Sequence, residues 1–409
     1  MKNVRSLCAM LMCALSPALT AEVQVNIRTS GSQANPAVAA SDAGGSIIVW
    51  SSYYTTAGRS NDILARRLDA IGAPVCDEFT VNVTTQGNQT VPAIAMDSRG
   101  AFAVAWQGPG AEEEDIFLRR FDPNGLPEPG ETLVNSGTMG RQLCPSVALN
   151  DAGTLGVAWE SREIVEDVNR TFVYARLFHP NGPALGDDIV LDASGHDCRY
   201  PDVAIDGHAG FAAAWLEERT SNNNVVIARL FDPNGVPTTE PLEVSTAGIA
   251  SLTRPVIAMN SCGHFVVAWD GDPNRASEDD VYIRPYDPNG APLGEPSIVN
   301  TVRSGPQQWP RVAINDTNEF VIIWEQAAED PNNATDIFVR QFDGTGQPAG
   351  EPVRINAYVP GKQQSPDGAL MSDGSFLAAW VSDEQDGSGY GIFAEFVLPV
   401  PSNDPNSAI

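Results

Sequence analysis

Hydrophobic and polar positions alternate with a period of two in a short segment that recurs along the chain. In residues 101–106, "AFAVAW", the bulky side chains of Phe102, Val104 and Trp106 occupy every second position, with alanines between them. This period is typical of a β-strand whose two faces meet different neighbours. Bulky residues on one face and alanines on the other favour sheets stacked face to face, because large side chains then meet small ones.

The segment belongs to a long internal repeat. Seven tryptophans, each 14 residues after a proline, recur at intervals of 53 to 56 residues. The tryptophans are Trp50, Trp106, Trp159, Trp215, Trp269, Trp324 and Trp380. One unit predicts four short strands, at 92–97 "PAIAMD", 101–106, 115–121 "DIFLRRF" and 131–135 "ETLVN". Repeats of this length with four antiparallel strands predict an all-β fold, a β-propeller of seven blades.

The last unit contains only three of the four expected strands. The missing strand stands near the start of the chain, where "EVQVN" at 22–26 matches "EFTVN" at 78–82 and "ETLVN" at 131–135. We therefore expect strand 22–28 to complete the seventh blade, which would leave few exposed strand edges. The propeller is predicted over 22–400, with repeats that start near 36, 92, 145, 201, 255, 310 and 366.

Both ends of the chain are expected to lie outside the propeller. Lys2 and Arg5 precede an apolar run at 7–15, and small residues lead to Ala21. This pattern predicts a signal peptide at 1–21, too short to span a bilayer. The protein is then secreted or located in the periplasm or outside the cell. Residues 401–409 are predicted to form a flexible tail.

The charge of the chain excludes several partners. There are 24 basic and 52 acidic residues, for a formal net charge of −28. Such a surface repels phosphates, so we expect neither nucleic-acid binding nor attraction to anionic membranes. No later apolar run suggests membrane insertion, and we expect a monomer.

The motif "FDPNG" at 121–125, with near-copies in other units, raises the question of calcium. Its residue types each suit a hairpin turn, because aspartate bonds the backbone two residues on and glycine accepts a left-handed conformation. A calcium loop needs a ladder of spaced acids that is missing here. We predict turns and no cofactor. Calcium remains an alternative for the acidic loops after the tryptophans, such as "EEED" at 112–115.

The arginine of the "R-x-F" segment recurs in six units, with leucine in place of the aromatic in the first, at Arg66, Arg119, Arg176, Arg229, Arg284 and Arg340. A residue repeated six times is a poor candidate for a single catalytic group. We predict that it bridges neighbouring blades through a carboxylate or a carbonyl oxygen.

Ligand binding is expected where the repeats differ, on the face formed by the loops between blades. The candidate residues are Arg141, His196, Arg199, Tyr200, Arg254, Gln308 and Trp309. Arginines combined with exposed aromatics suit an anionic or carbohydrate ligand. Trp309 stands out because it is the one tryptophan outside the repeat pattern. The alternative is that long polar side chains only surround the channel mouth.

Four cysteines follow the predicted signal peptide. Cys144 and Cys198 lie near the same strand start in neighbouring units, so they are a candidate disulfide, whereas Cys76 and Cys262 are too far apart to pair. No C-x-x-C segment indicates zinc. No H-E-x-x-H or serine-triad signature accompanies the four histidines.

The repeat resembles that of exported bacterial propeller proteins built from V-A-W and R-x-F-D-x-x-G-x-P units. The resemblance spans 22–400 and implies the fold without an established activity. We predict a non-enzymatic binding or scaffold module for glycans or proteins, with no catalytic residue assigned. The alternatives are a sialidase-like hydrolase and a calcium-dependent surface protein. The aspartate box S-x-D-x-G-x-x-W of sialidases is not reproduced, and a glycosidase needs two suitably spaced carboxylates.

Overall fold

The structure is a computed structural model that describes residues 21–41, 43, 45–53, 60–220, 223–245, 252–272, 278–328 and 333–398. These residues form β-strands and no helix, so none of them provides a helix that could cross a membrane. The predicted signal peptide, apart from Ala21, and the predicted tail at 401–409 lie outside the described residues.

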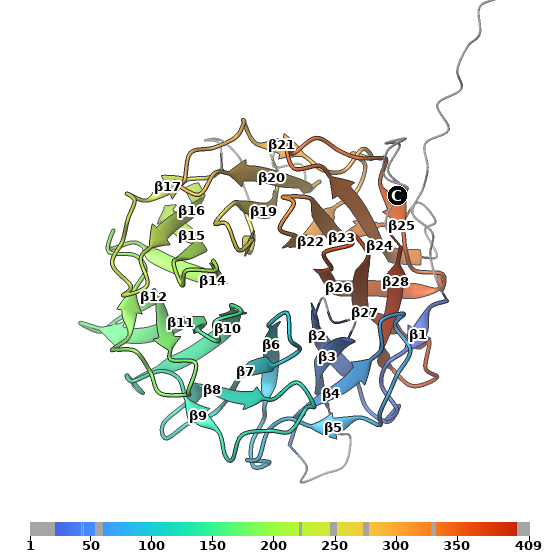
Figure 1. Ribbon diagram of the computed structural model, residues 1–409, viewed down its shortest axis with the longest axis horizontal. Helices are drawn as coiled ribbons and strands as arrows, with labels where there is room; N and C mark the ends of the chain where they lie inside the picture. Colours follow the sequence, from blue (N-terminus) through green and yellow to red (C-terminus); the bar gives the residue numbers. More distant parts are fainter. Residues whose placement is uncertain are drawn as a thin grey trace, which may run out of the picture.

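The strands form a ring of sheets around a central opening (Figure 1). Within the described chain, five of the sheets are separate four-stranded antiparallel blades, and the first strand of each is innermost. Blade one comprises β2 (Gln33–Ser41), β3 (Gly45–Ser52), β4 (Asp62–Leu68) and β5 (Phe79–Thr80). Blade two comprises β6 (Thr90–Met96), β7 (Phe102–Pro109), β8 (Glu114–Phe121) and β9 (Thr132–Leu133).

The next three blades follow around the ring. Blade three comprises β10 (Arg141–Leu149), β11 (Leu155–Val165), β12 (Val168–Phe178) and β13 (Ile189–Val190). Blade four comprises β14 (Asp197–Ile205), β15 (Phe211–Thr220), β16 (Asn223–Phe231) and β17 (Leu242–Glu243). Blade five comprises β18 (Val256–Met259), β19 (Phe265–Gly271), β20 (Asp280–Tyr286) and β21 (Ser297–Ile298).

The remaining strands form one eight-stranded sheet, where the sequence predicts separate four-stranded blades. They are β22 (Gln307–Ile314), β23 (Phe320–Ala327), β24 (Asn333–Phe342), β25 (Val353–Arg354), β26 (Gly361–Leu370), β27 (Phe376–Asp383), β28 (Tyr390–Val397) and β1 (Val23–Gln24). A short parallel contact between β24 and β26 joins them, with Thr335 opposite Lys362. The Thr335 hydroxyl also donates to the carbonyl of Gln363 at 2.8 Å, which reinforces this contact.

The strand at the start of the described chain closes the ring. β1 pairs antiparallel with β28, with Val23 opposite Ala394 and Gln24 opposite Phe393. The backbone N–H of Ile392 also donates to Asn26 Oδ1 at 2.8 Å. This is the pairing that the strand count of the repeats predicts, and it covers an edge of β28 that would otherwise be open.

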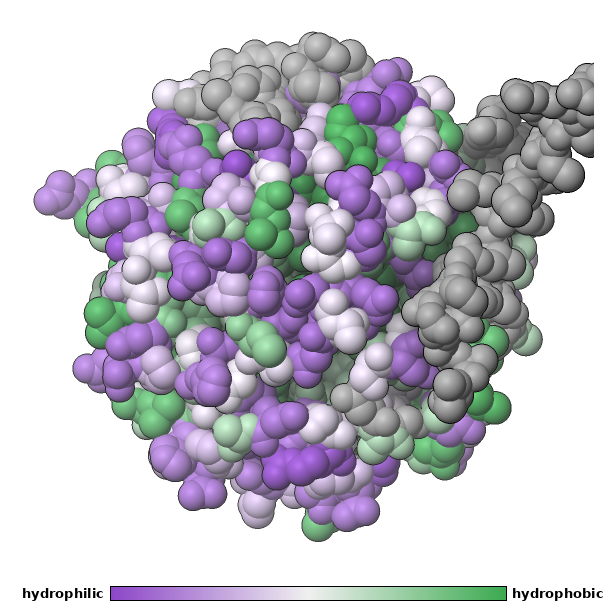
Figure 2. Space-filling model, turned by 45° about the horizontal axis from the view of Figure 1, so that its top comes forward, coloured by the Kyte–Doolittle hydropathy of each residue, from purple (hydrophilic) through white to green (hydrophobic). Residues whose placement is uncertain are grey.

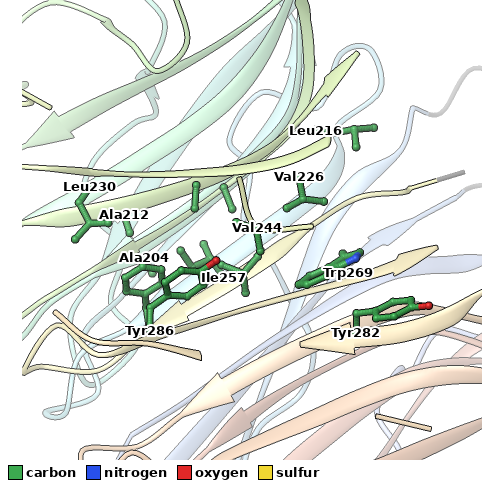
Figure 3. Close-up of a cluster of buried hydrophobic side chains, with 14 of the residues drawn as sticks. Ala204, Ala212, Leu216, Val226, Leu230, Val244, Ile257, Trp269, Tyr282 and Tyr286 are labelled. Carbon is green, nitrogen blue, oxygen red and sulfur yellow. The ribbon is translucent and has the colours of Figure 1, made fainter. Parts of the chain in front are cut away.

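The hydrophobic core lies between neighbouring blades. The seven repeat tryptophans are at most 1 % exposed. Figure 3 shows one interface, where Trp269 and Tyr286 of blade five face Ala212 and Val226 of blade four. Large side chains on one sheet therefore fill the space above small ones on the next, as the alternating pattern predicts. Outside this core, hydrophilic side chains dominate the face seen in Figure 2, and hydrophobic ones are scattered.

The D-P-N-G segments are turns. Asp122 Oδ1 accepts hydrogen bonds from the backbone N–H groups of Asn124 at 2.9 Å and Leu126 at 2.8 Å, and Gly125 has a φ of 82°. Asp232 and Asp287 accept the same pair of bonds in their own turns. These bonds, led by the one from Leu126, hold the pKa of Asp122 below its usual value. The local structure therefore accounts for the motif without a metal ion.

The repeated arginine joins a blade to the preceding one in five of the units. Arg119 Nη1 donates to the carbonyl of Val81 in blade one at 2.7 Å, while its Nε donates to Glu128 of its own blade. Equivalent bonds to a preceding outer strand are made by Arg66, Arg176, Arg284 and Arg340. The predicted bridging role is confirmed for these five arginines, and the acceptor is a backbone carbonyl; for Arg229 the bond is to Thr239 of its own blade.

Candidate functional site

The residue before the repeat proline lies at a β-bulge in the innermost strand of most units. Six of these residues have φ between 51° and 56°, in the left-handed region, and they are Asn35, Val91, Cys144, Tyr200, Trp309 and Ser365. This conformation is uncommon for residues other than glycine and is most strained for a β-branched one such as Val91. The ladder register shifts at each of these positions.

A side chain from the preceding blade holds five of the six bulges, those at Val91, Cys144, Tyr200, Trp309 and Ser365. The residue after the repeat tryptophan accepts the backbone N–H of the bulged residue, as Gln107 does for Cys144 at 3.0 Å and Glu325 does for Ser365 at 3.3 Å. Asp270 accepts the N–H of Trp309 in the same way. Burial raises the pKa values of Asp270 and Glu325 to about 7. These two carboxyls therefore change charge near neutral pH.

Blade five departs from this arrangement at Arg254. The residue after the preceding tryptophan is Leu216, which has no side-chain acceptor to hold a bulge. Arg254 is not among the left-handed residues, and β18 begins only at Val256. The segment before Pro255 lies outside the sheet ladder, and the Arg254 side chain lines the central opening.

A cavity of about 330 Å³ occupies this end of the channel. Its lining includes Arg254, Trp309, Arg311, Asp202 and Asp367. Arg254 Nε is buried and has no hydrogen-bond partner among the described residues. Most buried polar groups are paired, so an unpaired guanidinium N–H beside a cavity indicates a place for an acceptor. Trp309 is 46 % exposed, in contrast to the buried repeat tryptophans.

The two carboxylates of the cavity are already bound to neighbouring blades. Asp367 Oδ1 lies 3.3 Å from Arg311 Nε, and its Oδ2 accepts the N–H of Val38 at 2.7 Å. Asp202 accepts the Ser146 hydroxyl and the N–H of Ile257. Both groups therefore contribute to holding neighbouring blades together.

Among the described residues that line the cavity, Arg254 is the one cation without a counter-ion. Arg311 is paired with Asp367, and burial followed by the nearby Arg254 lowers the pKa of Arg311. Arg254 makes no recorded ion pair among the described residues, so its charge is available to a ligand. The site therefore suits binding of an anionic group.

Three predicted site residues are occupied elsewhere. Arg141 makes two bonds to Glu114, at 2.8 and 3.1 Å. Arg199 forms an ion pair with Glu218 at 3.0 Å. Gln308 donates to Asp279 at 2.5 Å. None of these three lines the cavity.

The other four predicted residues lie in three places: the cavity, the core and a loop. Arg254 and Trp309 both line the cavity. Tyr200 packs against the hydrophobic cluster between blades four and five. His196 is half-buried in the loop before β14 and does not line the cavity. The structure thus brings together two of the seven candidates.

The predicted disulfide is not formed, since Cys144 and Cys198 are both free thiols. The two residues occupy different places in the repeat. Cys144 is the bulged residue before Pro145, whereas Cys198 stands three residues before Pro201 and is 1 % exposed, within the core between blades three and four. Their side chains therefore lie in different parts of the structure, which does not favour a bond between them.

Sequence reasoning missed Asp202, Arg311 and Asp367. Each stands directly after a repeat proline, where other units carry Ala37, Ala93, Ser146 and Val256. Alignment of the units at this position would have revealed three charged residues facing the channel.

At the opposite end of the innermost strands, aspartate side chains accept backbone N–H groups from the neighbouring blade. Asp151 accepts the N–H of Ser98 at 2.8 Å, and Asp316 accepts that of Ser261 at 3.0 Å. A cavity of about 270 Å³ lies at this end. Its described lining holds three aspartates and no arginine, lysine or aromatic residue, so this mouth is the weaker candidate for an anionic ligand.

Comparisons with known proteins support the fold. No family model matches the chain, and no curated protein matches it. Among solved structures, a protein of unknown function from Dyadobacter fermentans is 8 % identical, with a TM-score of 0.54 over 95 % of this chain and 100 % of that one. A PL25 ulvan lyase bound to -[GlcA(1-4)Rha3S]- is 9 % identical, with a TM-score of 0.55 over 91 % and 95 %. A fungal AA5 alcohol oxidase in complex with copper is 11 % identical, with a TM-score of 0.51 over 94 % and 76 %. At these identities the likeness extends to the fold alone, and the chain is a β-propeller of four-stranded antiparallel blades.

Proposed function

We propose that the protein is an exported, non-enzymatic propeller that binds an acidic glycan at the mouth of its central channel. The observation that carries the proposal is the unpartnered Nε of Arg254 beside the exposed Trp309 in the cavity of about 330 Å³. A protein ligand that presents a carboxylate would use the same two side chains.

The two residues have complementary roles in this proposal. The planar guanidinium of Arg254 can hold a carboxylate or sulfate with two parallel hydrogen bonds. The indole of Trp309 offers a rigid, largely apolar surface for the face of a sugar ring. The ulvan lyase in the comparison binds a glucuronate-containing fragment, but our choice of ligand rests on Arg254 and Trp309.

The state of the carboxylates favours binding over catalysis. A sialidase-like hydrolase, the main alternative, needs two acids that are free to act on the ligand. In the cavity, Asp202 and Asp367 are committed to neighbouring blades. The observation in favour of a hydrolase is that Asp270 and Glu325 have pKa values near 7. Both, however, accept backbone N–H groups at the bulges.

The proposal includes seven blades and export. The eight-stranded sheet contains two runs of four strands, β22–β25 and β26–β28 with β1, joined only by the contact between β24 and β26. Counted as two blades, they give seven with the five separate ones. Export rests on the signal-like residues 1–21 and the net charge of −28. The third alternative, a calcium-dependent surface protein, is addressed by comparing ligand binding with and without calcium.

The decisive experiment compares binding to uronate-containing, sulfated and neutral glycans, with and without calcium. We expect the wild type to bind acidic glycans and to keep this binding in chelator. Arg254→Gln should weaken it by roughly 10- to 100-fold, the usual cost of a charged hydrogen bond. Arg199→Gln is the matched control, because Arg199 is paired with Glu218 outside the cavity.

Three results would contradict the proposal. Equal binding of neutral glycans would remove the role of charge. Unchanged binding by Arg254→Gln would place the site elsewhere. Hydrolysis of any of these glycans by the wild type would support the enzyme alternative.

A further inference from the structure

Three residues that depart from the repeat meet at the junction of blades three and four. Asp192, Cys198 and Glu217 each have one potential ligand atom, and these atoms lie within 4.8 Å of one another. The equivalent positions in blades two and three hold Asn135, Gln142 and Ser161. A neutral set in the regular repeat is therefore replaced here by two carboxyls and a thiol.

Two strands and one loop bring these residues together. Cys198 and Glu217 are directly opposite each other in the ladder between β14 and β15. They are 1 % and 4 % exposed. Asp192 follows β13, at the outer edge of blade three, and is half-buried. The cluster thus spans two blades and lies apart from the residues that line the channel cavity.

A buried hydrogen-bond donor is directed at the same place. Trp215 is fully buried, and its Nε1 has no hydrogen-bond partner among the described residues. In four other units the equivalent indole N–H donates to a glutamine three residues before the proline, at 3.0 to 3.1 Å. Cys198 occupies that glutamine position, so the indole N–H of Trp215 points toward the cluster and lacks its acceptor.

The charges of the cluster are poorly balanced by the protein. Burial, and next the nearby Asp192, raise the pKa of the Cys198 thiol. The recorded counter-charge among the described residues is Arg219, which lies 2.5 Å from Glu217 Oε1 and also pairs with Glu243. A buried carboxylate beside a thiol and a half-buried carboxyl is stabilised by a further positive charge.

We propose that Asp192, Cys198 and Glu217 bind one zinc ion that joins blades three and four. A thiolate with two carboxylates favours zinc over calcium or magnesium, which prefer oxygen ligands alone. Small side-chain movements bring the three atoms to the bond lengths of about 2.0–2.3 Å that zinc requires. A water on the fourth position would accept the hydrogen bond from Trp215.

The binding step has a simple balance. The zinc ion displaces the proton of the Cys198 thiol, a zinc–sulfur bond forms, and the proton passes to solvent. Glu217 uses one oxygen for the ion and keeps the other for Arg219. No electron transfer is involved.

The test uses the full-length protein after treatment with a chelator. Zinc titration should give one ion per chain with release of a proton, and cobalt should give the near-ultraviolet charge-transfer band of a thiolate complex. Cys198→Gln restores the glutamine of the regular repeat and an acceptor for Trp215, so it should fold. We expect it to bind zinc at least about 100-fold more weakly, beyond the cost of losing an outer-shell partner.

Cys262→Ser is the matched control, because Cys262 is an exposed thiol in a turn of blade five. It should keep both the zinc affinity and the cobalt band. Thermal unfolding is a second readout, since zinc should raise the Tm of the wild type and of Cys262→Ser but not that of Cys198→Gln. Absence of stoichiometric zinc binding in the wild type would overturn the proposal. So would equal zinc affinity in Cys198→Gln, or a cobalt complex without the thiolate band.

Discussion

Blades four and five differ from their neighbours at the indole of the repeat tryptophan. In blades one, two and three, Gln33, Gln89 and Gln142 accept the indole N–H. Cys198 and Leu252 replace this glutamine in blades four and five, and Trp215 and Trp269 have no recorded partner there. The unpartnered Arg254 and the Asp192–Cys198–Glu217 cluster lie in the same two blades or at their border. The departures from the repeat in blades four and five thus lie close to the unpartnered groups on which both proposals rest.

The largest expected difference is between a bulge held by a neutral side chain and one held by a carboxyl, which should respond differently to pH. The N–H of the bulged residue is held by the neutral Gln107 at blade three but by Asp270, with a pKa of about 7, beyond blade five. A folded-state pKa above the unfolded value of about 3.9 means that the folded protein holds the proton more tightly. The stability that this provides is complete below about pH 4 and is lost as pH rises toward and through 7.

Asp270→Asn should therefore flatten the dependence of stability on pH between about 4 and 8, by roughly 4 kcal/mol at most. The measurement is the free energy of unfolding by denaturant at several pH values. Gln107→Glu is the reciprocal variant, expected to add such a dependence at a regular blade. An unchanged slope in Asp270→Asn would show that this carboxyl does not titrate in the folded protein.

The next largest effect should separate two equivalent tryptophans. Trp106→Phe leaves the buried Gln89 amide without its donor, whereas Trp269→Phe breaks no recorded hydrogen bond. Both lose similar packing, so we expect Trp106→Phe to be the more destabilising by about 1–3 kcal/mol, the cost of an unsatisfied buried group. Chemical denaturation of both variants measures the difference. Equal losses would mean that the Gln89 bond contributes nothing net.

The smallest effect on stability should come from restoring the repeat glutamine in blade four. In metal-free protein, Cys198→Gln gives Trp215 an acceptor and should stabilise the fold by about 0.5–1.5 kcal/mol. Unfolding in the presence of chelator is the appropriate measurement, with Cys262→Ser as the neutral control. A loss of stability would indicate that the space at this junction does not admit a glutamine side chain.

Much of the fold could be predicted because its signals are local and repeated. The proline–tryptophan spacing marks the two inner strands, and Asp122 with Gly125 defines its hairpin by bonds within five residues. The pairing of β1 with β28 followed from the Asn26 spacing. The joining of two four-stranded runs into one sheet was not predicted, because the contact of Thr335 with Lys362 belongs to no repeat.

The candidate site was only partly predictable, because ion-pair partners come from neighbouring strands. Nothing in the segments around Arg141 and Arg199 shows that Glu114 and Glu218 neutralise them. Arg254 differs because its Nε has no partner among the described residues, which its own segment does not show. The predicted disulfide between Cys144 and Cys198 was wrong for a related reason. Both residues lie near a repeat proline, but Cys144 is the bulged residue directly before Pro145, whereas Cys198 lies three residues before Pro201.

The pairing of β1 with β28 has a consequence for folding kinetics. Val23 meets Ala394 across nearly the whole described chain, so the last ladder is the one with the greatest sequence separation. Contacts of this kind are slow to form because the loop they close is long. The blades made of consecutive strands can fold as they emerge, while the edge of β28 remains open until the chain returns to its own beginning. A circular permutant that places residues 22–28 after β28 would make this ladder local, and it should complete the ring faster.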